Sequence, residues 1–330
     1  MPGADAMTTD IPAYAVVADI GGTNARFAIA DLASLELLDI RTFPTAEHAT
    51  LAGAMRTYLE DAPQKVAHAG LAVAAPLLED TVKFTNATWT FKRSTLAQEA
   101  GLDAAYVFND FEAQAYALPV LTADELHLLH GGTAIEKAPK VVLGPGTGLG
   151  VASLVWSPAG WVPVAGEGGH QTFPAENERE LAILERMRKG LERLSVERAL
   201  SGPGLADIYR AVAASYGFSD AEHTPAEVEQ LAIAGEDDMA VQALDYFVKW
   251  LARFAGDMAL AFGARGGVYI GGGIAPKMLT RLEQADFREE FERKGRMKPF
   301  VESIPINVVV SDYPGLKGAA AGLRTKLANA

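Results

Sequence analysis

A carboxylate, two glycines and two polar residues stand together near the start of the chain, in the run DIGGTN. Asp19 ends a short apolar segment, and Gly21 and Gly22 follow it with backbone N–H groups that no side chain covers. Thr23 and Asn24 then add polar side chains. Consecutive N–H groups in such a turn suit a phosphate, and a carboxylate beside them can hold Mg²⁺ through water. An ordinary hairpin turn explains the same residues equally well.

A second glycine-rich run, GPGTGLG at residues 144–150, contains Gly146, Thr147 and Gly148. It is not the dinucleotide fingerprint G-x-G-x-x-G, because Leu149 takes the place of the last glycine and a strand pattern follows. It is not a Walker-type loop either, because the chain has no Gly-Lys pair. Alone the run is a weak signal. At the same place in a second half of the chain, it indicates two opposed turns that could hold one triphosphate.

The run NDF places Asn109 and Asp110 where a predicted strand passes into a predicted helix. Asn and Asp are favoured at helix N-termini because their side chains accept hydrogen bonds from free N–H groups. At the end of a strand that faces a cleft, Asp110 is also a candidate general base. The residue types leave the helix cap and the catalytic base as equal alternatives.

The run GEGGH at residues 166–170 gathers a carboxylate and an imidazole on a glycine-rich loop. The chain has no Cys and no H-E-x-x-H pattern, which disfavours a metal-dependent hydrolase. Glu167 and His170 are better suited as hydrogen-bond partners of a polyol. We expect the HLLH run at residues 127–130 on a solvated loop or helix face.

Three further glycines, Gly271, Gly272 and Gly273, end an apolar strand pattern and precede Pro276. Pro near the start of a helix is common, so the pattern predicts a strand, a glycine turn and a helix. Such a turn lets a flat ligand lie against the backbone. The alternative is that these glycines only end the strand before the next helix and bind no ligand.

Hydrophobic periodicity predicts the elements that carry these motifs. Strands are expected at residues 14–19, 27–31, 37–43, 66–76, 82–86 and 106–111, on both sides of the turn in 140–156, and at 266–273 and 306–312. Helices are expected at 47–61, from 112, and at 176–190, 196–200, 204–216, 225–234, 237–264 and 315–327. Each half opens with a hairpin around a glycine turn, which predicts a duplicated α/β unit with a cleft between the copies. A helix near 112–125 would make the connection a hinge.

Composition limits the function classes. The 330-residue chain has 29 basic and 42 acidic residues, a net charge of −13, so it has no general attraction to nucleic acid or anionic membranes. The absence of Cys excludes disulfides and thiol catalysis and suits a reducing cytoplasm. Residues 1–12 have no signal-peptide pattern and are expected to form a disordered leader.

Taken together, the motifs resemble those of the bacterial glucokinase family, within the actin-like, hexokinase-type sugar kinases. The resemblance covers nearly the whole chain from Tyr14, in the order DIGGTNARFAI, AVAAP, TNATWTF, NDF, GPGTGLGVA, GEGGH, SVERALSGPGL, GGVYIGGGIAPK and DYPGLKG. A related group of sugar kinases has a Cys-rich zinc motif after its GEGGH-like loop. This chain has QTFPAENERE there, so it resembles the zinc-free branch.

The resemblance implies a role for each matched residue and ATP-dependent phosphorylation of glucose on its 6-hydroxyl. Asp110 is implied as the general base, and the implied sugar ligands are Asn109, Glu167, His170 and Glu197. The residues implied to bind ATP are Asp19 (through Mg²⁺ and water), Gly21, Gly22, Thr23, Asn24, Gly146, Thr147, Gly148 and, on the adenosine side, Gly271, Gly272 and Gly273. A homodimer is implied as well.

The implied fold has two actin-like (ribonuclease H-like) α/β domains that flank a cleft. The small domain would hold residues 13–119 and 312–330, and the larger, helix-rich domain residues 120–311. A non-catalytic sugar sensor on the same fold is an alternative, which Asp110 disfavours. An ATPase of the actin or chaperone type is another, and the polar NDF, GEGGH and SVER runs disfavour it.

Overall fold

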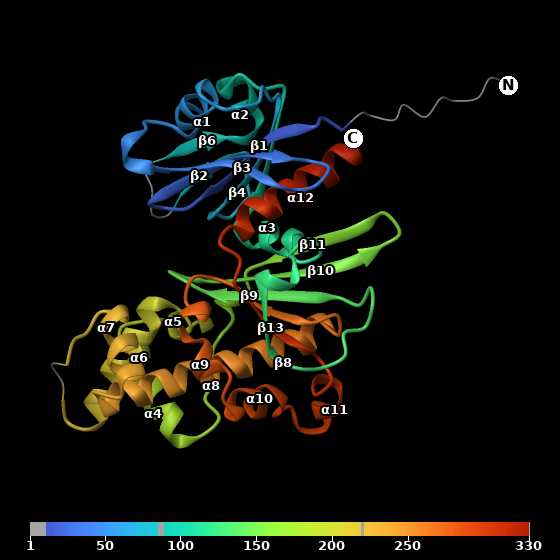
Figure 1. The fold of residues 1–330 in the computed structure, drawn as a ribbon. Coiled ribbons are helices and arrows are strands. Elements are labelled where there is room, and N and C mark those ends of the chain that lie inside the picture. Colours follow the sequence, from blue (N-terminus) through green and yellow to red (C-terminus); the bar gives the residue numbers. More distant parts are fainter. Residues whose placement is uncertain (1–10, 85–88, 219–220, 330) are drawn as a thin grey trace. The chain divides into compact units, whose positions relative to one another are not determined.

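In a computed structural model, the chain folds into two compact units (Figure 1). The structure describes residues 11–84, 89–218 and 221–329. The first unit runs to Thr122 and takes up the chain again from Ser311, and the second spans Ala123–Val310. The leader expected at residues 1–12 lies outside the described residues except for its last two positions. Thr85 and Asn86 of the strand expected at 82–86 also lie outside them.

The first unit is built on a five-stranded mixed sheet. Its strand order is β3 (Leu37–Pro44), β2 (Asn24–Asp31), β1 (Tyr14–Ile20), β4 (His68–Val73) and β7 (Ala104–Asn109). The strands β1 to β3 form an antiparallel meander, and β4 and β7 run parallel to β1. A separate hairpin joins β5 (Thr81–Lys83) and β6 (Thr90–Lys92). The predicted hairpin around the first glycine turn is confirmed.

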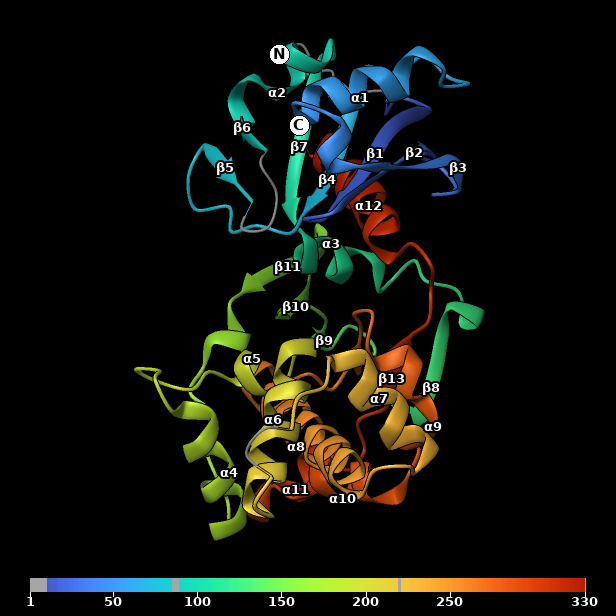
Figure 2. The ribbon, with the colours of Figure 1, turned by 90° about the vertical axis from the view of Figure 1, so that its left-hand side faces the viewer.

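Helices cover both faces of this sheet (Figure 2). Side chains alternate between the faces of a strand, so Val16 and Ala18 of β1 pack with α1 (Leu51–Glu60) and α2 (Arg93–Ala100). Ala15 and Val17 of the same strand pack with the C-terminal helix α12 (Pro314–Ala328). The helix α3 (Asp110–Ala117) lies on that face as well and contacts α12. The chain end thus completes the first unit.

The second unit repeats the same plan. Its sheet has the order β11 (Gly160–Gly166), β10 (Leu149–Ser157), β9 (Lys140–Pro145), β12 (Val268–Ile270), β13 (Ile306–Val309) and β8 (Leu126–His130). The strands β9 to β11 form an antiparallel meander, and β12 and β13 run parallel to β9. The strand β8 pairs antiparallel with β13. Two mixed sheets of matching topology confirm the predicted duplicated α/β fold.

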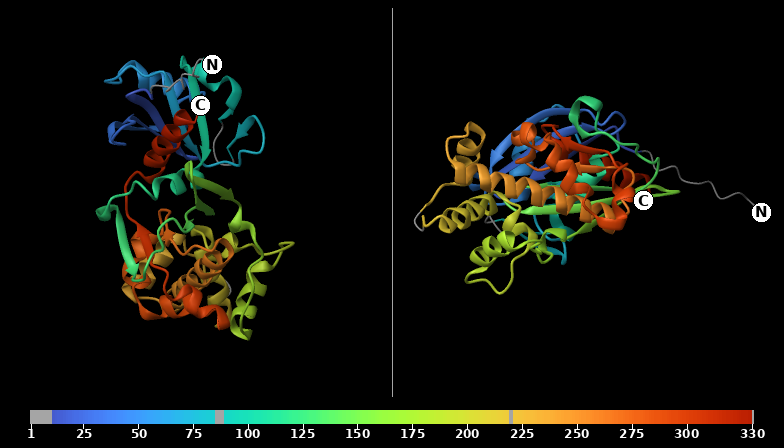
Figure 3. Two further views of the ribbon diagram at one scale, coloured as in Figure 1. Left: turned by 90° about the vertical axis from the view of Figure 1, so that its right-hand side faces the viewer. Right: turned by 90° about the horizontal axis from the view of Figure 1, so that it is seen from below.

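The helices of the second unit gather on one side of its sheet (Figures 2 and 3). They are α4 (Glu178–Arg188), α5 (Val196–Ala199), α6 (Gly202–Ser215), α7 (Pro225–Ala234), α8 (Asp238–Phe262), α9 (Leu279–Leu282), α10 (Ala285–Glu292) and α11 (Lys298–Val301). Phe247, Leu251 and Phe254 of α8 belong to the core beneath the sheet, as its helical spacing predicts. In the described ranges, no helix has the length and apolar character needed to cross a membrane.

Several expected boundaries are wrong, each for a local reason. The helix expected from residue 47 begins at Leu51, because Thr50 caps it by accepting a hydrogen bond from the Gly53 N–H. The helix expected across 112–125 ends at Ala117, two residues before Pro119, which has no N–H to donate. After Gly273 the chain forms a 3₁₀ turn at Ala275–Met278 before the short α9.

Candidate active site

The carboxyl ends of β1, β4 and β7 meet at one edge of the first sheet. Ile20, Val73 and Asn109 lie in register across these strands. Because neighbouring strands are about 4.8 Å apart, the ends of β1 and β7 lie about 10 Å from each other. The sheet therefore brings the turn after β1 close to Asn109 and Asp110 after β7.

The turn after β1 is tight, and a residue outside the turn, Thr45, stabilises it by hydrogen bonds. The Gly21 N–H donates to the Asn24 carbonyl oxygen at 2.9 Å. The hydroxyl of Thr45 donates to the carbonyl oxygens of Gly22 (2.9 Å) and Thr23 (3.1 Å). Thr45 is buried and lies far along the chain, so the motif did not reveal it. Its contacts fix the carbonyl side of the turn.

Asp19 lies at the end of β1, opposite Arg26 of β2. The Asp19 Oδ2 atom is 3.7 Å from the Arg26 Nη1 atom, and 29% of the Asp19 side chain is exposed. Burial raises the pKa of the Asp19 carboxyl above its ordinary value, and the Arg26 charge opposes that rise. The carboxylate is thus half-buried and lies beside the opposite charge of Arg26, at the rim of the first glycine turn.

Asn109 caps α3, and Asp110 is the first residue of that helix. The Asn109 Oδ1 atom accepts hydrogen bonds from the N–H groups of Phe111 (3.0 Å) and Glu112 (3.3 Å). Glu112 accepts in return from the Asn109 N–H, which completes a capping box. The Asn109 Nδ2 atom donates to the Ala75 carbonyl oxygen at 3.4 Å. The cap therefore belongs to Asn109, and the N-x-x-E spacing could have revealed it.

The predicted sugar ligand Glu197 contacts the second glycine turn. Its Oε2 atom accepts a hydrogen bond from the Leu149 N–H at 2.9 Å. A Cβ atom on Gly148 would lie 2.5 Å from the same oxygen, so a larger residue there would displace the carboxylate. The turn is closed by Gly146, whose N–H donates to the Gly148 carbonyl and whose own carbonyl accepts from the Gly202 N–H. Glu197 and the turn form one connected group.

The GEGGH loop lies beside the same turn. A Cβ atom on Gly169 would be 2.2 Å from the Leu149 carbonyl oxygen, so glycine is required for this approach. The Val196 N–H donates to the Gln171 carbonyl at 2.9 Å, which joins the loop to the helix that carries Glu197. The structure thus brings the GEGGH loop, Glu197 and the second turn together.

Glu167 and His170 project from this loop into solvent. Their side chains are 65% and 54% exposed, and the His170 Nε2 atom lies 3.8 Å from the Glu167 Oε2 atom. The backbone of His170 is held by Arg193, whose Nη1 atom donates to the His170 carbonyl oxygen at 2.6 Å. A fixed backbone with exposed polar side chains is suited to binding a polar ligand.

The third glycine turn packs on the second. The Gly271 N–H donates to the Leu143 carbonyl at 2.8 Å, as expected where β12 runs beside β9. A Cβ atom on Gly144 would lie 2.5 Å from the Gly271 carbonyl carbon, and one on Gly272 would lie 2.5 Å from the Pro145 carbonyl oxygen. Gly272 also has a positive φ of 79°. Two backbones can approach this closely only without side chains.

A cavity of about 530 Å³ opens near these turns in the second unit. Gly202, whose N–H binds the Gly146 carbonyl, lies where a Cβ atom would be 3.9 Å from both Pro225 and Ile274. The cavity is lined by Pro203, Ala206, Arg210, Glu222, His223, Thr224, Pro225 and Glu227. Its volume falls within the range of small-molecule sites.

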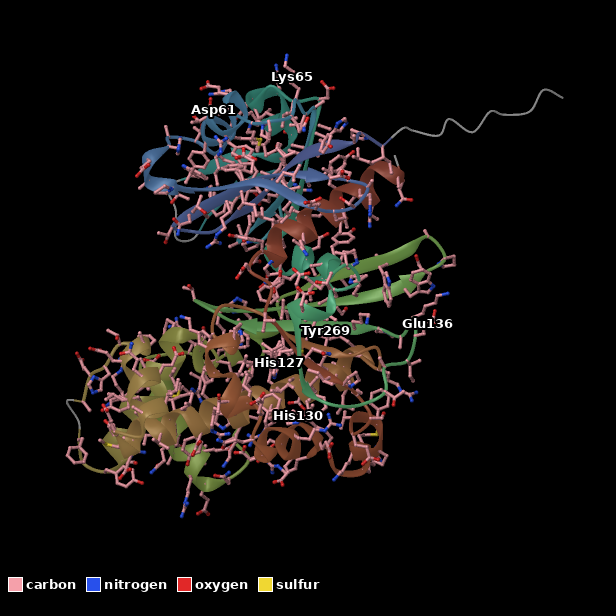
Figure 4. The ribbon with its side chains drawn as sticks, in the orientation of Figure 1. Asp61, Lys65, His127, His130, Glu136 and Tyr269 are labelled. Carbon is pink, nitrogen blue, oxygen red and sulfur yellow. The ribbon has the colours of Figure 1, made fainter. Side chains whose placement is uncertain are left out.

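The expectation that the HLLH run lies on a solvated loop or helix face is wrong. His127 and His130 belong to β8 (Figure 4). The His127 Nε2 atom lies 2.8 Å from Glu283, and the His130 ring stacks on Phe287 at 5.7 Å between centroids. Burial lowers the pKa of His130 below its ordinary value. Both histidines tie the edge strand to the helices that follow β12.

Comparison with known proteins covers nearly the whole chain. A family model described as glucokinase matches residues 16–326. The glucokinase of Neisseria gonorrhoeae is 44% identical over 315 residues, which cover 95% of this chain and 96% of that protein. The glucokinase of Erwinia tasmaniensis is 40% identical, with 95% of this chain and 98% of that protein covered.

Solved structures agree with these sequence matches. The crystal structure of a glucokinase from an Antarctic psychrotroph has a TM-score of 0.86 and 39% identity, over 95% of this chain and 99% of that one. A ROK-family glucokinase from Streptomyces griseus, at 20% identity and a TM-score of 0.66 over 94% of this chain and 99% of that one, shares the fold. The chain belongs to the glucokinase family, and with it to the phosphoryl-transferring kinases of the actin-like fold.

Proposed function

We propose that the chain transfers the γ-phosphoryl group of ATP to the 6-hydroxyl of glucose. The observation that carries the proposal is the shared sheet edge of the first unit, where Ile20 and Asn109 lie in register through Val73. That edge puts the first glycine turn, to which we assign phosphate binding, near the Asn109–Asp110 pair. Full-length identity of 40–44% to glucokinases supports the same substrates.

In this proposal, Asp110 accepts the proton of the 6-hydroxyl as its oxygen bonds to the γ-phosphorus. The bond from that phosphorus to the β–γ bridging oxygen breaks, and ADP leaves. Asn109 already uses its Oδ1 atom for the helix cap and one N–H for the Ala75 carbonyl, so the second N–H of its amide is the part that a sugar oxygen could bind. Since the transition state is loose, positioning and charge stabilisation provide most of the catalysis.

Glu167, His170 and Glu197 hold the remaining sugar hydroxyls in this proposal. Glu197 gives its Oε2 atom to the Leu149 N–H, which leaves its Oε1 atom for the sugar. The carboxylate therefore links sugar binding to the shape of the second glycine turn. That link supports placing the sugar and the phosphates in one site.

The glycine turns fit the phosphates of ATP. Around the Cβ positions of Gly146 and Gly273, no atom beyond the adjacent residues lies within 4 Å, so a ligand could approach this side of both turns. Asp19 would hold Mg²⁺ through water, with the phosphates as the metal's other ligands. Among the described residues, no three acidic, His or Cys side chains form a group that could hold a metal ion directly. The cavity beside Gly202 is where we place the nucleotide base.

A panel of hexoses with MgATP, read as ADP formation, tests the function. We expect glucose to stimulate ADP release strongly. Release that no sugar stimulates would indicate an ATPase, and sugar binding without release would indicate a sensor. A cytoplasmic location and a homodimer belong to the same proposal and stay predictions.

Two matched carboxylate variants test the sugar site. We expect Glu167→Ala and Glu197→Ala each to raise the KM for glucose by about 10–100-fold, the effect of losing a hydrogen bond to a charged group. Glu197→Ala should also raise the KM for ATP several-fold, because the Leu149 N–H loses its acceptor. Glu167→Ala should leave the KM for ATP unchanged. Steady-state kinetics with each substrate varied would contradict this assignment if both variants changed both constants equally.

A further inference from the structure

The first turn of α12 lies directly against the Asp19 carboxylate. A Cβ atom on Gly315 would be 2.8 Å from Asp19 Cγ, 2.9 Å from Oδ2 and 3.2 Å from Oδ1. Real Cβ contacts essentially never fall below 3.0 Å, so a side chain at 315 would force the carboxylate or the helix to move. Gly315 is itself buried.

The helix has little freedom to move away. A Cβ atom on Gly318 would lie 1.8 Å from the Ala113 carbonyl oxygen of α3, and one on Gly70 of β4 would lie 2.7 Å from the Ala319 carbonyl oxygen. These backbone contacts fix α12 against both neighbours. Any atom added at residue 315 would therefore displace the Asp19 carboxylate rather than the helix.

Helix formation does not explain a glycine at this position. Gly315 has no positive φ, and alanine is the better helix former at an ordinary helical position. The contact with Asp19 does explain it. We propose that Gly315 is a positioning residue for phosphoryl transfer, which sets where the Asp19 carboxylate lies relative to the metal-bound phosphates. This inference rests on the role proposed above for Asp19.

The test compares Gly315→Ala, Asp19→Ala and the double variant. We expect Gly315→Ala to lower kcat by about 10²-fold, the effect of misplacing a reacting group by about 1 Å. In the Asp19→Ala background, the same change should cause no further loss, because both variants act through one carboxylate. Calorimetry of ADP with and without Mg²⁺ gives a second readout. The gain in affinity from Mg²⁺ should shrink in Gly315→Ala.

Thermal melting separates this role from a general packing defect. With Asp19 present, Gly315→Ala should not raise the Tm; with Asp19→Ala it should raise the Tm by about 2 °C, since the clash is gone and alanine favours the helix. If Gly315→Ala alone did not fold, recovery of folding in the double variant would support the contact. Gly322→Ala is the matched control, because its methyl would meet the rings of Phe108 and Tyr116. It should lower the Tm without changing the effect of Mg²⁺.

Each outcome decides between the proposals. Wild-type turnover in Gly315→Ala, or losses that add in the double variant, would overturn the positioning role. A harmless Asp19→Ala would instead overturn the role of Asp19 in the proposed function. If Gly315→Ala behaved like Gly322→Ala in both melting and Mg²⁺ dependence, the contact between Gly315 and Asp19 would have only a structural role.

Discussion

Asp110→Asn should lower kcat by a factor of about 10²–10⁴, the usual contribution of a general base. This equals about 3–5 kcal/mol in the activation barrier. The amide keeps the shape of the carboxylate but cannot accept the proton of the sugar hydroxyl. Because Asn109 provides the cap of α3, the variant should keep that cap, and its Tm should fall less than that of Asn109→Ala. Glucose affinity by calorimetry should change far less than kcat.

Asn109→Ala provides the contrast on the same helix. It removes the side chain that accepts from the N–H groups of Phe111 and Glu112, and loss of a cap costs about 1 kcal/mol of stability. It should therefore lower the Tm by more than Asp110→Asn does. A folded Asp110→Asn enzyme with near-normal turnover would remove Asp110 as the base.

Arg253→Met should lower the free energy of unfolding by about 3–5 kcal/mol, because it leaves the buried Glu180 carboxylate without its counter-charge. Arg253 lies on α8 with only 4% of its side chain exposed. It donates to both oxygens of Glu180 at 2.9 Å and forms ion pairs with Glu176 (3.1 Å) and Glu290 (3.5 Å). At about 2–4 °C per kcal/mol for a domain of this size, the Tm should fall by about 6–20 °C.

Arg293→Met is the matched control for this cluster. Arg293 pairs with Glu176 and Glu290, but 51% of its side chain is exposed. Exposed pairs contribute about 0–1 kcal/mol, so this variant should melt close to the wild type. Equal falls in Tm in the two variants would show that burial does not determine how much each arginine contributes to stability.

The pH dependence of the Tm tests the same interaction between Arg253 and Glu180. Burial alone would raise the pKa of Glu180, but the hydrogen bonds and charge of Arg253 lower it below the ordinary 4.5. The stability from this pair is therefore fully present above pH 4.5 and is lost as the pH falls through the lowered value. In Arg253→Met, the lowering by Arg253 is lost while burial, the largest cause, remains, so the pKa of Glu180 should rise and protonation should relieve the buried charge. The Tm deficit of the variant should thus be smaller at pH 5 than at pH 7.

The elements that could be predicted from the sequence are those that local patterns define. The hairpins around both glycine turns are short apolar runs on either side of glycines, so their type does not depend on distant residues. The strand β8 was missed because its pairing partner β13 lies about 180 residues further along the chain. The strand β11 was missed because glycine, proline and two exposed valines weaken its pattern.

The same limit applies to the site. Asn109 and Asp110 were found because a strand end and a helix start adjoin in sequence. The bonds from Glu197 to Leu149 and from Thr45 to the first turn depend on how distant segments pack. The contact between Gly315 and Asp19 depends on a helix from the other end of the chain. No spacing rule within one segment could have revealed these contacts.

The return of α12 to the first unit has a consequence for biosynthesis. Strands β1 to β7 and helix α3 leave the ribosome before the second unit, yet the face of β1 formed by Ala15 and Val17 is covered by a helix that is translated after that unit. At about 5–20 residues per second, the intervening second unit takes on the order of 10–40 s to synthesise. During that time the nascent chain carries an uncovered apolar surface, and the second unit has all its residues once Val310 is made, before α12 is translated. The later-translated unit can therefore complete its fold before the earlier one.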